Sequence, residues 1–562
     1  TKMTTRRATT QSASFVADSV NSSSSNNKDD ASKKIKNNLY RQFTTAIVVV
    51  MMIVLILSLP QNNDDGYNKK WFITLQKSSH HPSSILPSPP IPKGLRLVQL
   101  QVIHRHGDRT PITPMSDVSY WKSQLPTKEE LDLLEEENPK VVLIRDEPSG
   151  KEKYHHSAAG DDTFGRLTSL GIQQMISVGQ ALRSDLLSML SNNANNNNNK
   201  DNVIIHPGMI HVASTDFPRT ILSAKSVIQG LFHTSTASSK PPFNMKENGN
   251  IEIDLRYTTR MIPDPKPRLY TNQLALETQI TTEDAKFISK EKEMYPLAVR
   301  ISNVLYEQNF VDAAKASLLS FGVGEDKDDK KQVESSEQQK YPILSWIQLA
   351  EISHCLMARN LLPLDFISSK DYNDIMNYVA WRWFYILSNA DLSKMALKSL
   401  IKKIVWNAYS YVEYKEQDGN EEGQQQPLLY LFSAHDATLI GLMCGLHMEQ
   451  PSQWPDYGSF LKVELFEDEK GVCLYGNCKE PKRGSVRGIG ALKNEDEQIG
   501  PNYYLRFSLN NQVLKSKWGS RSIIDGDNNG ADDHERGVVY REFIPLEEAR
   551  DAVMYLEESL LG

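Results

Sequence analysis

Two arginines flank a histidine in residues 105–111, whose sequence is Arg-His-Gly-Asp-Arg-Thr-Pro. The segment follows an apolar, strand-like run, and Gly107 lets the backbone turn tightly. A guanidinium presents a planar fork of donors that suits phosphate oxygens, so Arg105 and Arg109 can hold a dianion. The neutral imidazole of His106 can then attack the phosphorus and become a phosphohistidine. This pattern predicts a phosphatase with a histidine nucleophile.

Two later segments supply groups that would complete such a site. In residues 432–438, Phe-Ser-Ala-His-Asp-Ala-Thr, His435 is suited to donate to a phosphate oxygen and Asp436 to protonate the leaving alcohol. In residues 213–220, Arg219 is expected in the first turn of a helix, where anions are attracted. Taken alone, each of these two segments fits an ordinary helix start with a capping residue equally well.

The first segment is also open to a different chemistry. His104, His106 and Asp108 alternate as the ligands of a metallo-hydrolase do. However, Arg109 stands where that pattern has a further histidine, and two arginines would place positive charge beside the metal. A third interpretation is a phosphate-binding ectodomain without turnover. The histidine-nucleophile interpretation requires no metal and no cofactor, and its partner is a small phosphate monoester.

Three short runs, residues 95–103, 209–214 and 428–433, have the composition of β-strands, and each precedes a helix-like stretch. Alternating strands and helices predict an α/β sheet, in which reactive groups gather beyond the carboxyl ends of the strands. All three candidate segments lie at such ends. The sequence thus predicts that one sheet edge brings them together.

Between the second and third runs, apolar residues recur at helical spacing, in residues 346–356, 375–386 and 397–408. This pattern predicts a helical insertion over the sheet, with the substrate between the two parts. Four polar inserts, at residues 192–202, 324–340, 417–426 and 519–537, are expected to be surface loops.

From about Leu95 onward, the chain resembles the histidine acid phosphatase family, the second branch of the histidine phosphatases. Besides the first segment, residues 167–174 (Leu-Thr-x-x-Gly-x-x-Gln) and 179–183 (Gly-x-x-Leu-Arg) resemble a helix of that family. Residues 214–224 and 433–439 are similar to two further family motifs. The implied fold is phosphoglycerate-mutase-like: a central mixed sheet flanked by helices, with an inserted helical cap.

The resemblance also implies roles for single residues. Ala213 stands where many members have an arginine, but this departure does not touch the matched positions. By resemblance, His106 is the nucleophile and Asp436 the proton donor, and the reaction is acid phosphatase chemistry without a metal. The implied phosphate-binding residues are Arg105, Arg109, Arg219 and His435.

The substrate is set by the loops around the site. The adjacent His435 and Asp436 resemble the general acid phosphatases more than the phytases. Residues 230–232 (Gly-Leu-Phe) and 453–455 (Gln-Trp-Pro) resemble the lysophosphatidic acid phosphatase type 6 group. A membrane-tethered 2-phosphoxylose phosphatase would suit the predicted topology instead. We therefore expect either a lysophospholipid or a sugar phosphate as substrate.

Composition excludes some classes of protein. The 562 residues are 39% hydrophobic and 24% charged with a net charge of −7, so the chain is globular and offers no basic surface for nucleic acid. The four cysteines are too few for a disulfide scaffold. Cys473 and Cys478 fit a small bridge and a pair of free thiols equally well.

Residues 43–59 form an apolar run of the length needed to span a bilayer. Lysines and an arginine precede the run and Pro60 ends it, which favours a signal-anchor with a cytoplasmic N-terminus over a buried core helix. A signal peptide with a long leader is the alternative. The catalytic domain is thus expected to be lumenal or extracellular, on a single-pass membrane protein of the secretory pathway or cell surface.

These features divide the chain into four parts. Residues 1–42 are expected to be a disordered cytoplasmic tail, and residues 60–93, which are rich in proline and polar residues, a low-complexity stem. Residues 94–562 are expected to form the phosphatase domain, with the helical cap at roughly residues 235–415.

Overall fold

A computed structural model of the chain describes residues 85–136, 139–145, 163–193, 205–232, 250–265, 268–270, 272–312, 341–416, 426–451, 454–468, 502–518 and 540–558. The predicted tail, the predicted signal-anchor and most of the predicted stem lie outside these ranges, as do Cys473 and Cys478. None of the described helices is both long and apolar enough to cross a membrane.

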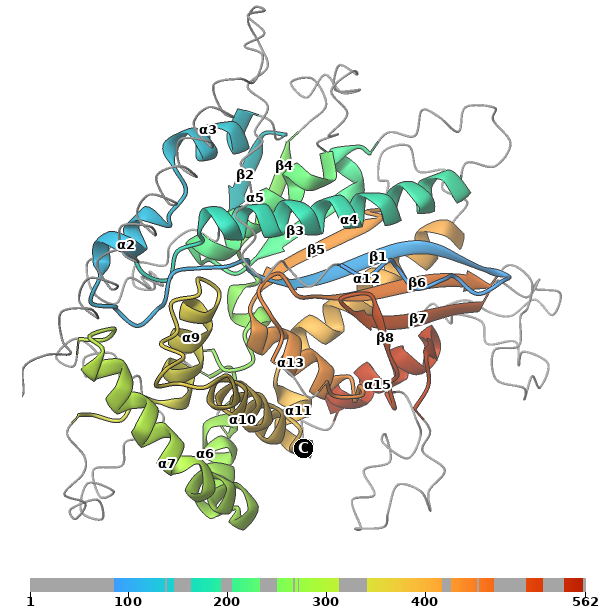
Figure 1. Ribbon diagram of the computed structural model, residues 1–562. Helices are drawn as coiled ribbons and strands as arrows, with labels where there is room; N and C mark the ends of the chain where they lie inside the picture. The colour runs from blue at the N-terminus through green and yellow to red at the C-terminus, as the bar shows by residue number, and fades with distance from the viewer. Residues whose placement is uncertain are drawn as a thin grey trace, which may run out of the picture. The chain divides into compact units, whose positions relative to one another are not determined.

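The described residues contain a nine-stranded sheet in the order β2-β4-β3-β5-β1-β6-β7-β8, with β9 beside β7 (Figure 1). The strands from β2 to β1 are parallel to their neighbours, and those from β6 onward are antiparallel. This mixed sheet confirms the predicted α/β class. The strands are β1 (Leu95–Arg105), β2 (Val141–Ile144), β3 (Ile210–Ser214), β4 (Ile251–Asp254), β5 (Leu429–Ala434), β6 (Phe460–Asp468), β7 (Asn502–Leu509), β8 (Gln512–Leu514) and β9 (Phe543–Pro545).

The three predicted strands are β1, β3 and β5, which lie side by side in the centre of the sheet. Their register places His104, Ser214 and Ser433 level with one another. Because the three strands are parallel, the chain leaves all of them at the same edge. The three candidate segments therefore emerge next to each other, as the sequence predicted.

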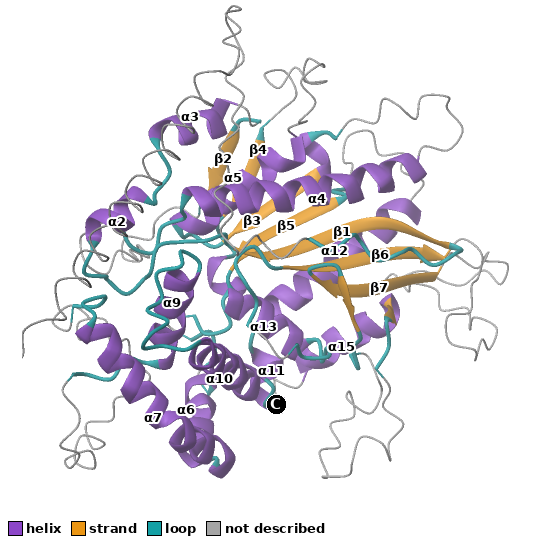
Figure 2. Ribbon diagram, in the orientation of Figure 1, coloured by secondary structure: helices purple, strands orange, loops and turns teal. Residues whose placement is uncertain are grey.

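Helices cover both faces of the sheet (Figure 2). One apolar core lies between β1, β3 and β5 and the helices α4 (Ser169–Asn193) and α5 (Pro218–Phe232). A second core lies on the opposite face, against α12 (Lys398–Glu416), α13 (Asp436–Gly445) and α15 (Leu546–Glu558). The central strands are apolar on both sides because both sides are covered.

A helical cap lies at the carboxyl end of the central strands (Figure 1). It has its own apolar core, to which Trp121 also contributes. Serines cap two of its helices, Ser345 and Ser368, each in a reciprocal capping box. The cap helices are α6 (Gln273–Glu283), α7 (Ala285–Glu307), α9 (Trp346–Met357), α10 (Ser369–Leu387) and α11 (Ala390–Met395).

The range predicted for the cap, residues 235–415, also holds elements that lie with the sheet, namely β4 and most of α12. Backbone carbonyls of α12 accept hydrogen bonds from the buried side chains of Gln99 and Gln101 on β1. The remaining short elements are α2 (Val118–Ser123), α3 (Lys128–Glu136), and the 3-10 helices η2 (Pro207–Met209) and η3 (Thr258–Met261).

The end of the predicted stem lies on the domain rather than apart from it. The buried Arg506 donates to the carbonyl oxygens of Pro89 and Pro90, and the buried Lys462 donates to Ser88. Proline-rich chain exposes its carbonyl oxygens, because it makes few hydrogen bonds of its own. Arg506 on β7 uses two of these carbonyl oxygens and Lys462 on β6 uses the Ser88 hydroxyl, so the folded part begins before Gly94.

Candidate active site

One pocket of about 330 Å³ is lined by all six predicted site residues. They come from three places that are far apart in the sequence: the end of β1 and the loop after it, the first turn of α5, and the start of α13. The cap helices α9 and α10 close the opposite side. The six residues are Arg105, His106, Arg109, Arg219, His435 and Asp436.

The imidazole of His106 is oriented by its own loop. Its Nδ1 atom lies 2.9 Å from the carbonyl oxygen of Gly107. A carbonyl oxygen can only accept, so Nδ1 carries the proton and Nε2 keeps its lone pair. This is the tautomer that a nucleophilic histidine needs.

The surroundings of His106 keep its ring neutral. Burial and the three surrounding arginines hold the pKa of His106 well below its ordinary value of 6.5. The ring is only 2% exposed. Its lone pair therefore stays available at acid pH, where an exposed histidine would be protonated.

Three buried arginines offer unused donors around this ring. Among the described residues, the Nε–H groups of Arg105, Arg109 and Arg219 are buried and have no hydrogen-bond partner. An unpaired buried donor is costly, so three in one pocket are suited to an anion with several oxygens. Burial and the nearby Arg109 lower the pKa of Arg219 to about 9, which reflects this excess of positive charge.

Asp436, the first residue of α13, is held as a carboxylate. Its Oδ2 accepts from Arg105 at 2.9 Å, and its Oδ1 accepts from the backbone N–H of Ala437 at 2.8 Å. Burial would raise the pKa of Asp436, but Arg105, His435 and the Ala437 N–H outweigh burial and hold the pKa below its usual range.

His435 lies at the N-cap of α13, and both of its ring nitrogens have protein neighbours. Nε2 is 3.0 Å from Thr215 Oγ1, and Nδ1 is 3.5 Å from a terminal nitrogen of Arg219. The second distance is at the limit of a hydrogen bond. Arg219 can only donate, so Nδ1 accepts in this contact, and donation from His435 to phosphate, as the sequence predicted, would require a proton on Nδ1.

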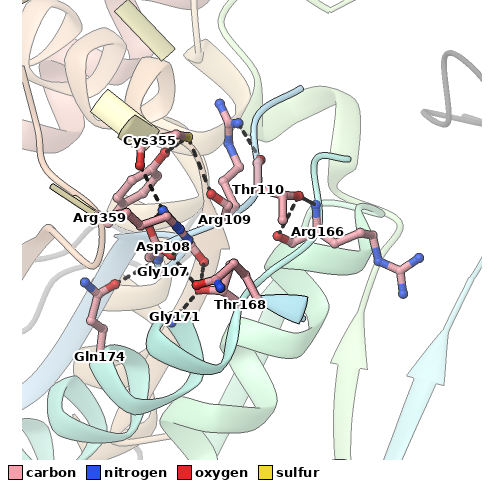
Figure 3. Close-up of polar contacts among 12 residues, drawn as sticks. Gly107, Asp108, Arg109, Thr110, Arg166, Thr168, Gly171, Gln174, Cys355 and Arg359 are labelled. Atoms are coloured by element: carbon pink, nitrogen blue, oxygen red, sulfur yellow. Dashed lines mark hydrogen bonds and ion pairs between the residues drawn. The ribbon is translucent and has the colours of Figure 1, made fainter. Parts of the chain in front are cut away.

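The start of α4 holds the signature loop, residues 106–113, from below (Figure 3). Thr168 donates from its hydroxyl to the carboxylate of Asp108 at 2.5 Å, and Gln174 accepts from the Asp108 backbone N–H at 2.8 Å. A Cβ atom on Gly107 would lie 2.4 Å from the carbonyl oxygen of Gly171. The Leu-Thr-x-x-Gly-x-x-Gln pattern thus positions the loop that carries His106.

Three cap side chains that sequence reasoning missed hold the same loop from the other side. Glu351 accepts from Arg109 at 3.0 Å and from the backbone N–H of Thr113 at 2.7 Å. Cys355 contacts the carbonyl oxygen of Arg109 at 3.5 Å, and Arg359 pairs with Asp108 at 2.5 Å (Figure 3). Their four-residue spacing in a mostly apolar stretch is the signal that could have revealed them.

The metal-site alternative requires His104, His106 and Asp108 to converge on one point. Instead, Asp108 is bound by Arg359 and Thr168, and His104 Nδ1 contacts the carbonyl oxygen of Arg105 at 3.2 Å. Within the described ranges, no group of three or more His, Cys, Asp or Glu side chains is placed to hold a metal ion. These residues do not fit a metal centre.

A family model described as histidine phosphatase superfamily (branch 2) matches residues 96–321. Over these residues, the chain is similar to this branch of the histidine phosphatases. The match begins in β1 and includes the signature loop and Arg219.

Several relatives of this histidine phosphatase are named as phosphatases. A bovine lysophosphatidic acid phosphatase type 6 is 27% identical over 406 residues, which cover 69% of this chain and 78% of that protein. A probable acid phosphatase of Dictyostelium discoideum is 23% identical over 422 residues, covering 73% of this chain and 71% of that protein. The protein is a phosphoric monoester hydrolase.

Other relatives carry different names. Counting factor 60 of Dictyostelium discoideum is 22% identical over 388 residues, covering 67% of this chain and 78% of that protein. Among solved structures, a Hafnia alvei phytase aligns with a TM-score of 0.45 and 13% identity, covering 83% of this chain and 98% of that one.

Proposed function

We propose that His106 is the nucleophile of a two-step acid phosphatase reaction. In the first step, Nε2 attacks the phosphorus, the bond from phosphorus to the ester oxygen breaks, and Asp436 protonates the departing alcohol. In the second step, water attacks the phosphohistidine, Asp436 takes a proton from that water, and phosphate leaves. The observation that carries this proposal is the neutral, oriented ring of His106 among three arginines with unpaired donors.

The first step requires a protonated Asp436, although the ion pair with Arg105 favours the carboxylate. A phosphate dianion changes this balance, since it neutralises the arginines and adds negative charge beside the carboxylate. Both effects raise the pKa of Asp436 when substrate binds. Activity is then expected to decline as pH rises through that higher pKa, because the acid loses its proton.

We also propose that the leaving group is apolar, as in a lysophospholipid. The cationic groups cluster at the phosphate end of the pocket, and no lysine is among its described lining residues. The walls beyond are largely apolar, and Ile112 and Ile347 remain 42% and 51% exposed. Relatives named lysophosphatidic acid phosphatase type 6 support this choice over a sugar phosphate.

The test compares the wild-type protein with His106→Ala on an aryl phosphate, a lysophosphatidic acid, a sugar phosphate and an inositol hexakisphosphate. We expect His106→Ala to lose on the order of a thousandfold or more in kcat on every substrate that the wild type turns over. His206→Ala, which removes an exposed histidine outside the pocket, is the control and should keep full activity.

Two outcomes would contradict these proposals separately. Near-normal turnover by His106→Ala would exclude His106 as nucleophile. A higher kcat/KM for the sugar phosphate or the inositol phosphate than for lysophosphatidic acid would exclude the apolar leaving group.

Residues 43–59 lead us to propose, further, a single-pass signal-anchor with the catalytic domain on the lumenal or extracellular side. The run and its flanking positive charges support this topology. Protease treatment of sealed membranes tests it: the domain should be protected inside secretory vesicles, and digestion without detergent would exclude that topology.

A further inference from the structure

A short segment between α13 and β6, residues 454–457, contacts two site residues at once. The indole N–H of Trp454 donates to Asp436 Oδ2 at 3.2 Å. The carbonyl oxygen of Pro455 accepts from Arg105 at 2.6 Å, and the ring of Tyr457 lies 4.2 Å from the same guanidinium. This segment therefore orients the first phosphate-binding arginine and the proton donor together.

The two oxygens of Asp436 have different partners. Oδ2 accepts from Arg105 and Trp454, neither of which can accept a hydrogen bond in return. A proton on Oδ2 would have to displace one of these donors. Oδ1 accepts from the backbone N–H of Ala437 and keeps a lone pair.

We propose that Trp454 is a positioning residue for the general acid: its indole N–H fixes Asp436 Oδ2, so that the acidic proton is carried on Oδ1. The inference rests on the proposed role of Asp436. An indole suits this task because it donates over the whole pH range and never accepts or ionises. A hydroxyl or a histidine could reverse its role and leave the proton on either oxygen.

The position of Trp454 also links the acid to the cap. Trp454 is half-buried and lines the pocket, and its ring meets that of Trp383 on α10 edge to face at 6.4 Å. A leaving group between cap and sheet would lie against both rings. The same residue can thus set the direction of the acid and contact the alcohol that receives the proton.

Other charged and titratable groups face Asp436 and must be held constant when its pH dependence is tested. Arg105, His106 and Arg109 come from β1 and the loop after it, Arg219 from α5 and His435 from the N-cap of α13. Glu351 and His354 approach from α9, with Asp264 and Tyr457 on the adjoining loops. A change confined to Trp454 leaves all of these in place.

The test compares kcat as a function of pH for two variants that remove different halves of the side chain. Trp454→Phe keeps an aromatic ring but loses the N–H, while Trp454→Gln keeps an N–H donor but loses the ring. Loss of a donor to the carboxylate favours the protonated acid. In Trp454→Phe, we expect the descending limb of the kcat profile to shift to a pH about one unit higher. In Trp454→Gln, it should stay near its wild-type pH.

The leaving group provides a second readout. An alkyl phosphate needs protonation of its leaving oxygen far more than an aryl phosphate does, so misplacing the acid should matter more for the alkyl ester. We expect the maximal kcat of Trp454→Phe to fall about tenfold on an alkyl phosphate and much less on an aryl phosphate. In an Asp436→Asn background, Trp454→Phe should have no further effect on kcat for the alkyl phosphate.

A matched control is Trp346→Phe, which also removes an indole N–H bonded to a carboxylate, but at Glu291 in the cap. Its profile should coincide with that of the wild type. A Trp454→Phe profile that also coincides, together with an impaired Asp436→Asn, would overturn the role of Trp454 alone. Full alkyl-phosphate turnover by Asp436→Asn would instead overturn the proposed acid.

Discussion

At the scale of single residues, the pocket is prepared for an anion before one arrives. The three arginines around His106 each present a buried, unpaired Nε–H group. Donors already fixed in place stabilise charge that develops in the transition state without reorganising at that moment. The cost of burying these donors unpaired is offset when a phosphoryl group supplies acceptor oxygens.

The three arginines differ in their carboxylate partners. Arg109 is paired with Glu351 and Arg105 with Asp436, so two of the three arginines already have a carboxylate partner in the empty pocket. Arg219 has no carboxylate within salt-bridge distance among the described residues, and it lies over the ring of Phe217 at 4.6 Å. A bound phosphate dianion would therefore interact with Arg219, which has no carboxylate partner, and with Arg105 and Arg109, which also pair with protein carboxylates.

The residues of the pocket differ in how far the sequence could predict them. His106, Arg219 and Asp436 follow strand-like runs. Parallel strands bring such residues to one edge of the sheet, independently of the conformation of the loops. Trp454 and Glu351 act through loop and cap geometry, which depends on the packing of distant helices. Their contacts could not be predicted from local sequence pattern.

At the scale of elements, α9 and the turn after it form one side of a clamp on the signature loop, and α4 forms the other. Three helices of this region were predictable from apolar spacing, because α9, α10 and α12 cover the three predicted ranges, although α12 lies with the sheet. The contacts that form the clamp could not be predicted, because they are made by the few polar residues in and next to these helices. A helical pattern predicts which face is buried but not what it is buried against.

The pair between Arg359 and Asp108 tests this clamp. Both side chains are buried, with 6% and 0% exposed. Arg359→Met leaves the Asp108 carboxylate buried without its cation, so we expect the free energy of unfolding to fall by about 3–5 kcal/mol, with a lower kcat. Urea unfolding and steady-state kinetics measure the two effects.

A second variant separates lost charge from lost packing. Asp108→Asn together with Arg359→Met removes both charges, and it should recover a large part of the lost stability. Lys370→Met, which breaks an exposed pair with Asp374, is the surface control and should leave stability nearly unchanged. Equal losses from Lys370→Met and Arg359→Met would exclude the clamp as a stabilising contact.

At the scale of the whole molecule, the covered sheet buries histidines that take a proton less readily in the folded chain than in the unfolded one. Burial lowers the pKa of His104 to about 4, and burial followed by the nearby Lys403 lowers that of His211 to about 4. The unfolded chain takes up these protons near the ordinary pKa of 6.5. Stability is therefore complete above about pH 6.5 and is lost progressively as pH falls toward 4.

We accordingly expect the melting temperature to fall as pH is lowered from 7 to 4, with His104 alone contributing a loss of about 3 kcal/mol by pH 4. His104→Asn, whose side-chain amide can donate to the Arg105 carbonyl oxygen in place of Nδ1, should flatten this decline. Thermal melts over that pH range check the prediction. Identical slopes in both proteins would show that His104 does not contribute to acid sensitivity.

The docked segment before β1 has a practical consequence for producing the enzyme. Ser88, Pro89 and Pro90 supply hydrogen-bond partners for Lys462 and Arg506, which are buried in the sheet. A recombinant protein that begins at Gly94 would leave both cations with fewer partners, at a cost in stability. A truncation meant to isolate the catalytic domain should therefore keep residues 85–93.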